Sequence, residues 1–145
     1  MKRFAILFAL ITLVGCTDTP TADTQEAVEV ETDPVQTALS AVGVETALLV
    51  DVRTDEEWES GHFAAATHVP LADLQDAEKA KDATSGLTKT KLIYVHCAKG
   101  KRAVAAVEEL KKMGFKAVAL ETTYDAIRDA GFEEAGSKEE ANSEE

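Results

Sequence analysis

Cysteine and tryptophan are scarce in this sequence, and basic residues are outnumbered by acidic ones. The 145 residues include two cysteines, one tryptophan and three prolines. Two cysteines permit at most one disulfide. Lysine and arginine number 15 against 27 aspartates and glutamates, which gives a formal net charge of −12. A surface this acidic argues against nucleic-acid binding, because phosphates are bound by basic faces.

A long hydrophobic run is also missing. The most apolar stretch, residues 4–14, follows Lys2 and Arg3 and is interrupted only by Thr12. It is shorter than the roughly 20 residues that a membrane-spanning helix requires. A short apolar run behind a basic flank is typical of a signal peptide. We therefore expect residues 1–15 to be removed from the mature chain.

The apolar run ends in Leu-Val-Gly-Cys, which resembles the bacterial lipobox. The resemblance implies a lipoprotein signal peptide, cleaved after Gly15, and acylation of Cys16, which would anchor the chain to a membrane. Thr17 stands where aspartate commonly signals retention in the inner membrane. The expected location is therefore the bacterial cell envelope, on the periplasmic face of the outer membrane if the host has one. A secretory signal with a chance cysteine is the alternative.

Acylation of Cys16 would leave Cys97 as the only free thiol. An exported protein works in a compartment where free thiols are at risk of oxidation. A chemical role for Cys97 is therefore favoured more than it would be for a cytosolic cysteine.

Composition divides the mature chain into three parts. Residues 16–34 are rich in Thr, Asp and Glu, which predicts an acidic flexible tether. Residues 133–145 are acidic and poor in apolar residues, which predicts a disordered tail. Residues 35–132 remain for one domain with a single core.

Apolar runs of strand length alternate with helical patterns in this domain. Strands are expected at residues 47–52, 67–71, 91–96 and 116–120. Helices are expected at residues 35–42, 55–60, 102–113 and 124–130, with a weaker one at 71–83. Val28 and Val30 alternate with glutamate and could add a short edge strand. Unbroken apolar strands separated by helices predict an α/β fold with a parallel sheet.

The most informative stretch is His-Cys-Ala-Lys-Gly-Lys-Arg, which surrounds Cys97. It connects a predicted strand to a predicted helix, at the sheet edge where α/β proteins bind ligands. Such a loop directs backbone N–H groups at an anion, and Gly100 permits the turn. The added charge of Lys99, Lys101 and Arg102 favours the thiolate, the nucleophilic form of cysteine. The alternative is a buried structural cysteine beside solvated lysines.

Two separated motifs resemble those of the rhodanese-like family, and the resemblance covers residues 35–132. The first motif is carried by Asp51, Arg53, Glu57, Gly61, His62 and Pro70. The second, a Cys-x-x-Gly-x-Arg loop, is carried by Cys97, Gly100 and Arg102. The resemblance implies a small five-stranded parallel α/β sheet flanked by helices, and sulfurtransferase chemistry.

For the site, the resemblance implies that the Cys97 thiolate takes a sulfane sulfur from a small sulfur-containing anion or persulfide donor. Cys97 would hold this sulfur as a persulfide. The substrate-binding groups would be the backbone N–H groups of Ala98, Lys99, Gly100, Lys101 and Arg102. A thiol or a cyanide-like acceptor would then remove the sulfur. Neither a metal nor a dissociable cofactor is implied.

Three charged residues are expected to give structural support to the site. Arg53 and Glu57 are expected to form an ion pair. Asp51 ends its strand at the same sheet edge as Cys97, and it could either brace the loop through Arg102 or cap a turn.

The histidines and the tryptophan are also assigned structural roles. His96 precedes Cys97 on a strand, so its side chain is expected on the opposite face of the sheet. His62 and His68 are expected to be structural, and Trp58 to form a partly buried lid over the core.

The sequence also departs from the family pattern. Thr122 and Thr123 stand where the family often has a glycine pair, and Ala65 stands where it often has glycine. The shape of the pocket is therefore left open, and a non-catalytic binding module with the same fold is an alternative. A Cys-dependent phosphatase is disfavoured, because the loop from Cys97 to Arg102 is one residue shorter than in that class.

Overall fold

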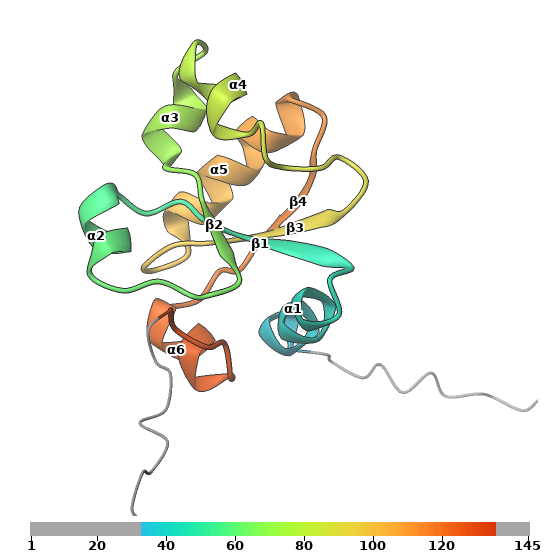
Figure 1. Ribbon diagram of the computed structural model, residues 1–145, viewed down its shortest axis with the longest axis vertical. Coiled ribbons are helices and arrows are strands. Elements are labelled where there is room, and N and C mark those ends of the chain that lie inside the picture. Colours follow the sequence, from blue (N-terminus) through green and yellow to red (C-terminus); the bar gives the residue numbers. More distant parts are fainter. Residues whose placement is uncertain (1–32, 136–145) are drawn as a thin grey trace, which may run out of the picture. The chain divides into compact units, whose positions relative to one another are not determined.

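A parallel sheet of four strands forms the centre of the fold (Figure 1). The structure is a computed structural model, and it describes residues 33–135. The strands lie in the order β2-β1-β3-β4, and all neighbours run parallel. Their bounds are β1 (Ala47–Asp51), β2 (Ala66–His68), β3 (Leu92–His96) and β4 (Lys116–Ala119). The predicted parallel α/β architecture is confirmed.

The described residues contain four strands where five were expected. The remaining candidate for a strand, residues 28–30, lies outside the described residues. β2 starts and ends earlier than predicted, although the chain stays beside β1. Val69 N–H donates to the Asp51 carbonyl at 2.9 Å, and Leu71 N–H donates to the Val52 carbonyl at 3.2 Å. Pro70 lies between these two donors, where its missing N–H leaves no partner unsatisfied.

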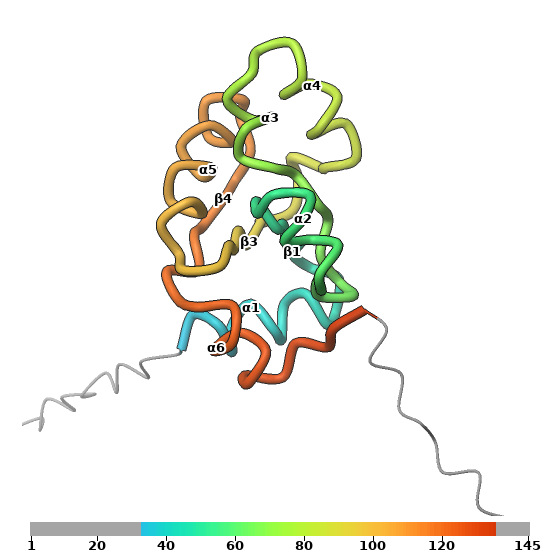
Figure 2. The backbone as a smooth tube through the Cα atoms, turned by 90° about the vertical axis from the view of Figure 1, so that its left-hand side faces the viewer, coloured from blue at the N-terminus to red at the C-terminus, as the bar shows by residue number. Residues whose placement is uncertain are grey.

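Helices cover both faces of the sheet (Figures 1 and 2). One face carries α1 (Pro34–Gly43) and α6 (Tyr124–Asp129). The other carries α3 (Leu71–Gln75), α4 (Lys79–Ala83) and α5 (Lys101–Lys112). A further short helix, α2 (Asp55–Glu59), follows β1 at the edge of the sheet. The weakly helical stretch predicted at residues 71–83 thus forms two short helices.

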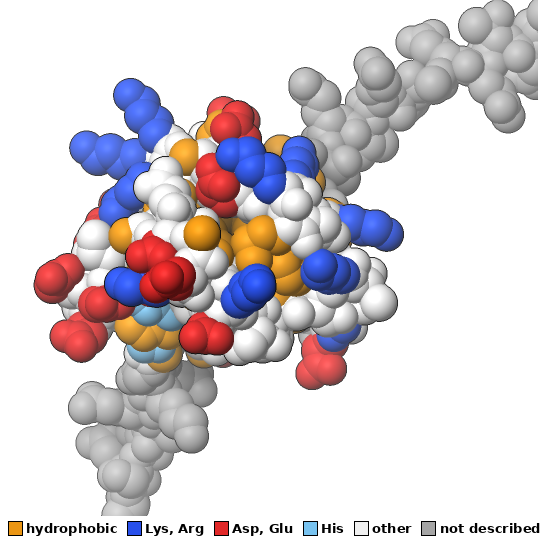
Figure 3. All heavy atoms as spheres, turned by 90° about the horizontal axis from the view of Figure 1, so that it is seen from above, with side chains coloured by type: hydrophobic (Ala, Val, Ile, Leu, Met, Phe, Trp, Pro, Cys, Tyr) orange, Lys and Arg blue, Asp and Glu red, His pale blue; other side chains and the backbone are white. Residues whose placement is uncertain are grey.

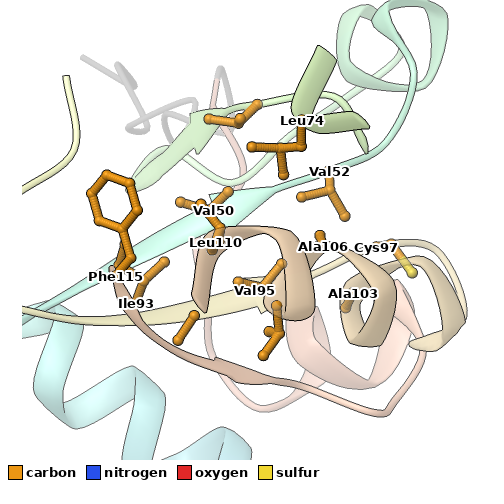
Figure 4. Packing of buried hydrophobic residues seen from close by; sticks show 13 residues of the cluster. Val50, Val52, Leu74, Ile93, Val95, Cys97, Ala103, Ala106, Leu110 and Phe115 are labelled. Atoms are coloured by element: carbon orange, nitrogen blue, oxygen red, sulfur yellow. The ribbon is translucent and has the colours of Figure 1, made fainter. Parts of the chain in front are cut away.

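Alternation along the strands divides the core into two clusters. Val50 and Val95 point toward α3 and α5, and Figure 4 shows them packed against Leu110 of α5. Leu49 and Tyr94 belong to the second cluster, on the side of α1 and α6. Both faces of the central strands are therefore buried, which explains their unbroken apolar sequences.

Two helix boundaries follow from signals in the sequence. The Thr54 hydroxyl accepts from Glu57 N–H at 3.3 Å, and a Glu57 carboxylate oxygen accepts from Thr54 N–H at 3.1 Å. This reciprocal pair forms a capping box at the start of α2. α5 is followed by Gly114, whose φ of 87° is a left-handed conformation that favours glycine.

The carboxyl ends of the strands meet at one edge of the sheet, on the left in Figure 1. The ladder continues there, because Val52 N–H donates to the His96 carbonyl at 3.1 Å and Leu120 N–H to the Val95 carbonyl at 2.8 Å. The connections after β1, β3 and β4 therefore leave the sheet side by side, and they form the candidate site.

The chain after α6 is paired with an earlier segment. Ala64 N–H donates to the Glu133 carbonyl at 2.9 Å, and Ala135 N–H donates to the His62 carbonyl at 2.7 Å. The prediction of a disordered tail from residue 133 is therefore wrong for residues 133–135, because their backbone groups are satisfied by residues 62–64.

The signal peptide and almost all of the tether, including Cys16, lie outside the described residues. The tether prediction is wrong for residues 33 and 34, because Asp33 caps α1 and Pro34 begins it. The rest of the assignment and the acylation of Cys16 remain predictions. Within residues 33–135, no helix combines the length and the apolar character needed to cross a membrane.

Candidate functional site

Cys97 lies directly after β3 and is a free thiol. Its side chain is only 1% exposed and belongs to the core cluster that contains Val52 and Ala103. Figure 4 shows its sulfur at the end of this cluster, in the bend between β3 and α5. The predicted nucleophile is therefore at the predicted sheet edge, but its sulfur lies beneath the loop and not on an open surface.

The loop after Cys97 has the form of an anion cradle. It leads directly into α5, which begins at Lys101. Among the described residues, no backbone carbonyl accepts from the N–H groups of residues 98–102. These donors lie at the positive end of the α5 dipole and are available to an anion. Lys99 and Lys101 are exposed, so their charges are more screened than that of the half-buried Arg102.

The loop after Cys97 packs closely against the connection between β4 and α6. Gly100 has a φ of 81°, and a Cβ at this position would lie 2.8 Å from Glu121 Cα. The Ala98 carbonyl accepts from Tyr124 N–H at 3.1 Å. Both contacts fix the loop to residues 121–124, so a side chain at position 100 would displace one backbone from the other.

The departure from the family's glycine pair is accommodated at this contact. Neither Thr122 nor Thr123 has a positive φ, so this backbone path does not require glycine there. Thr123 instead caps α6, since its hydroxyl accepts from Ala126 N–H at 3.2 Å. The close approach of the two backbones depends on Gly100.

Arg102 is held by Glu57. Arg102 Nη1 donates to Glu57 Oε2 at 2.6 Å, and Arg102 Nη2 donates to Glu57 Oε1 at 2.8 Å. The expected pairing of Arg53 with Glu57 is therefore wrong. The capping box places Glu57 on the first turn of α2, where its carboxylate faces the start of α5. The two-bond geometry orients the guanidinium beside the reactive loop.

The pair shifts the protonation of both partners. The hydrogen bonds from Arg102 lower the pKa of Glu57 to about 2. The pKa of Arg102 is raised, first by its hydrogen bonds to Glu57 and to a smaller extent by Cys97. Both groups therefore stay charged at neutral pH, and the cation lies within electrostatic reach of the thiol.

Asp51 pairs with Arg53 and not with Arg102. Arg53 Nη2 lies 2.7 Å from Asp51 Oδ2, and Arg53 N–H donates to Asp51 Oδ1 at 2.9 Å. Of the two expectations for Asp51, the turn cap is confirmed and the brace through Arg102 is wrong. The physical reason is strand alternation, which puts Asp51 and Cys97 on opposite faces of the sheet.

The Asp51–Arg53 pair is part of a buried cluster on the α6 side. Arg53 Nη2 also donates to the Gly61 carbonyl at 2.6 Å, and its guanidinium lies 4.2 Å above the Tyr124 ring. Burial alone would lower the pKa of Arg53, but the hydrogen bonds and charge of Asp51 raise it. Burial and the hydrogen bond to Glu134 raise the pKa of Tyr124 to about 12.

His96 lies on the opposite face from Cys97, as predicted. It is fully buried beside Phe63 and Tyr124, and neither ring nitrogen has a hydrogen-bond partner among residues 33–135. Its Nε2 lies 3.7 Å from Asp51 Oδ2. Burial lowers the pKa of His96 to about 4, so the ring is neutral at physiological pH and does not act as the base for Cys97.

Trp58 lies between two histidine rings. Its ring is stacked on His62 at 3.6 Å and on His68 at 4.6 Å between centroids. His62 Nδ1 lies 3.0 Å from the Trp58 carbonyl, and His68 Nε2 lies 3.1 Å from the Arg53 carbonyl. The two histidines thus have the structural role expected of them, and the stacking of His68 on Trp58 ties α2 to β2. Trp58 contacts the two histidine rings, and its expected role as a lid over the core stays a prediction.

A cavity of about 360 Å³ opens beside Arg102. It is bounded by the connection from β1 to α2 and by the start of α3. Cys97 does not line it, but Val52 does, and Val52 packs in the same core cluster as Cys97. The cavity therefore borders the reactive loop without exposing the thiol.

The sequence profile of the rhodanese-like domain matches residues 34–130. This chain belongs to the rhodanese-like domain family. Solved structures support the same fold. A rhodanese-like domain protein from Staphylococcus aureus is 31% identical, with a TM-score of 0.52 over 68% of this chain and 92% of that one. A rhodanese-related protein from Thermoplasma volcanium is 26% identical, with a TM-score of 0.55 over 69% and 93%.

Curated relatives have names that refer to sulfur chemistry. The putative sulfur carrier protein YrkF of Bacillus subtilis is 34% identical over 70 residues, which are 48% of this chain and 35% of the relative. The thiosulfate sulfurtransferase GlpE of Coxiella burnetii is 31% identical over 71 residues, or 49% and 61%. The chain thus spans between 35% and 61% of the length of these two relatives.

Sequence reasoning missed the role of Tyr124. Its backbone holds the reactive loop, its ring lies beneath Arg53, and its hydroxyl donates to Glu134 at 2.9 Å. The available signal was its position directly after Thr123, in the segment that replaces the family's glycine pair. No spacing rule connects that segment to Cys97, so the contact became visible only in the fold.

Proposed function

We propose that this protein is a sulfurtransferase that carries a sulfane sulfur as a persulfide on Cys97. The observation that carries the proposal is the loop between β3 and α5. It combines a free thiol with backbone N–H groups of residues 98–102 that have no backbone acceptor among the described residues. The sulfurtransferase and sulfur-carrier names of distant relatives support the same chemistry.

The reaction has two balanced steps. The Cys97 thiolate attacks the outer sulfur of thiosulfate, the bond between the two sulfurs of thiosulfate breaks, and sulfite leaves with the electron pair. The new persulfide carries one negative charge on its terminal sulfur, which the loop N–H groups and the α5 dipole stabilise. An acceptor thiolate then attacks this terminal sulfur, and the Cys97 thiolate leaves. Neither step requires an external oxidant or reductant.

One observation favours the alternative of a non-catalytic binding module. The Cys97 side chain is 1% exposed, so a donor reaches the sulfur only when the loop yields. The enzyme and the module are separated by whether Cys97 takes up and releases sulfur.

The test uses the full chain in detergent with Cys16→Ser, because this substitution leaves Cys97 as the only cysteine. After exposure to thiosulfate and removal of the excess, intact-mass spectrometry should show one added sulfur atom. Adding a thiol should remove this atom. Cys97→Ser in the same background should gain nothing while keeping the circular dichroism spectrum of the parent. A parent that takes up no sulfur from thiosulfate or from a polysulfide would exclude the enzyme and leave the binding module.

The same proposal includes attachment of the chain to a membrane through acylated Cys16. The Leu-Val-Gly-Cys sequence at residues 13–16 supports it. When the gene is expressed in a bacterium that processes lipoproteins, the parent should sediment with membranes and Cys16→Ser should not. Equal membrane fractions for both proteins would rule out the lipid anchor. If only the parent sediments with membranes, separation of the inner and outer membranes tests the proposed location on the periplasmic face of the outer membrane.

A further inference from the structure

The cavity beside the reactive loop has the size of a small-molecule site. Its volume of about 360 Å³ lies within the usual range for ligand pockets. Its apolar lining comes from Val52, Pro70 and Leu71. Arg102, the last residue of the reactive loop, also lines it, whereas Cys97 does not. A molecule bound here therefore borders the loop, and it reaches the sulfur only when the loop moves.

Neither arginine of the cavity lining leaves an unpaired positive charge there. Arg53 is bound to Asp51 at 2.7 Å, on the opposite face of the sheet from Cys97. Arg102 is bound through both terminal nitrogens to Glu57. Each positive charge is compensated by a carboxylate at contact distance, so the arginines offer little attraction to a second anion.

The remaining charges of the lining are negative. They belong to Asp55 and Glu56 on α2 and to Asp73 on α3. Asp55 is 81% exposed and lies 3.7 Å from His68, whereas Asp73 lies 3.5 Å from Lys79, which is 66% exposed. Contacts this exposed compensate a carboxylate only weakly. Figure 3 shows several red side chains near the pale-blue histidines on the left of this face, with blue side chains among them.

We propose that the sulfur acceptor is a small thiol that carries an ammonium group close to its sulfur. This inference rests on the sulfur transfer proposed above and names its acceptor class. Asp55 and Asp73 attract the ammonium group from two walls of the cavity, while Val52 and Leu71 receive the short carbon chain. An acceptor with a carboxylate or sulfonate in place of the ammonium group meets repulsion from the same two walls.

The transfer itself adds no new reactant. The acceptor loses its thiol proton to solvent, and its thiolate attacks the terminal sulfur of the Cys97 persulfide. The bond between Cys97 Sγ and that sulfur breaks, and a bond between the acceptor sulfur and the same sulfur forms. The ammonium group takes no part in bond making. It raises the local concentration of the acceptor and orients it, so its effect is expected in the second-order rate constant.

The experiment measures discharge of the persulfide by three thiols of similar size and different charge. The full chain with Cys16→Ser is loaded with thiosulfate and mixed with cysteamine, 2-mercaptoethanol or 3-mercaptopropionate. Each rate constant is divided by that of the same thiol with a small free persulfide, which removes differences in intrinsic reactivity. The expected order is cysteamine, then 2-mercaptoethanol, then 3-mercaptopropionate, and added salt should reduce the spread.

The double variant Asp55→Asn/Asp73→Asn separates charge from structural damage. Its discharge by cysteamine should be slower by roughly threefold or more, since each exposed contact contributes a modest energy. Its loading by the thiosulfate dianion should be faster, because the same repulsion has been removed. Opposite changes in the two steps are not expected from a misfolded protein. The control variant Asp82→Asn/Glu108→Gln removes two carboxylates outside the cavity. Its rates of discharge by cysteamine and of loading by thiosulfate should stay close to those of the parent.

The outcomes are distinguishable. A parent that takes up no sulfur overturns the proposed function, and this inference with it. A parent that is loaded but discharges equally to all three thiols, or fastest to 3-mercaptopropionate, overturns only the acceptor class. Equal changes in the cavity variant and in the control variant also overturn it, because the effect would then come from net charge and not from the cavity.

Discussion

Arg102 at the start of α5 is bound through both terminal nitrogens to Glu57, 45 residues earlier in the chain. Glu57 also completes the cap of α2. One carboxylate therefore fixes the first turn of a short helix and the guanidinium beside the reactive thiol. This dual role gives the carboxylate a structural and an electrostatic effect, and the two can be measured separately.

Glu57→Gln should change stability and thiol reactivity in opposite directions. The loss of a half-buried ion pair should lower the free energy of unfolding at neutral pH by about 1 kcal/mol. The freed charge of Arg102 should favour the Cys97 thiolate and speed its alkylation by iodoacetamide. Chemical denaturation and alkylation rates, both in the Cys16→Ser background, measure the two effects. Slower alkylation would mean that Arg102 needs its partner in order to stay near the thiol.

The same pair predicts a stability change in acid. The pKa of Glu57 is about 2 in the folded protein, against a usual value of about 4.5. Between these pH values the unfolded chain binds more protons, so the contribution of the pair is present above about pH 4.5 and is lost as the pH falls toward 2. Denaturation curves of Glu57→Gln should lack this component. Parallel curves for the parent and the variant across that range would contradict it.

His96 predicts a second pH window, which extends to higher pH. Its pKa is about 4 when folded, against 6.5 for an exposed histidine, because burial disfavours the charged ring. The unfolded chain therefore binds more protons in this window, and the free energy of unfolding falls as the pH drops from about 6.5 to 4. His96→Leu should remove a slope worth roughly 3 kcal/mol across the window. A parent with no slope there would show that the ring can be protonated within the fold.

Gly100→Ala should disable the loop. The added Cβ would lie 2.8 Å from Glu121 Cα, and the φ of 81° is unfavourable for alanine. We expect a loss of roughly 1–3 kcal/mol in stability and little sulfur loading by thiosulfate. Gly86→Ala is the matched control, because a Cβ there meets no described residue within 4 Å. Normal loading by Gly100→Ala would show that the loop does not need its contact with residues 121–122.

Tyr124→Phe tests the connection between the C-terminal segment and the site. It removes the hydroxyl that donates to Glu134 at 2.9 Å and leaves the ring and the backbone contact with Ala98 in place. We expect a cost of about 1 kcal/mol in unfolding free energy and sulfur loading close to that of the parent. Glu134→Gln keeps an acceptor and should cost less. A large loss of loading in Tyr124→Phe would give the hydroxyl a role in the site.

The sequence predicted the site in one respect and failed in another, for physical reasons. The place of Cys97 followed from strand length and from the rule that the carboxyl ends of parallel strands meet at one edge. The capping box of Thr54 and Glu57 is a local pattern, because its two residues are three positions apart in the sequence. Arg102 pairs with Glu57 and not with Asp51. Asp51 pairs instead with Arg53, because the two residues are two positions apart and strand alternation brings both side chains to one face.

Contacts between distant loops could not be predicted in this way. The approach of Gly100 to residues 121–122 depends on how far β4 extends beside β3. The sequence pattern of neither segment predicts that extension. The pairing of residues 133–135 with residues 62–64 has the same origin. An acidic composition indicates a free tail unless backbone partners are known, and here the partners, residues 62 and 64, lie about 70 residues earlier.

The contact between Gly100 and Glu121 also limits how the loop can be re-engineered. A Cβ added to Gly100 would already lie within 3 Å of the Glu121 backbone, so one residue inserted after Cys97, to give the loop length of a Cys-dependent phosphatase, would find little room on this side of the loop. The insertion alone would therefore not produce a phosphate-sized pocket. The path from β4 to α6 would have to be rebuilt in the same step, so a change between the two chemistries on this scaffold requires coordinated changes in two segments more than 15 residues apart.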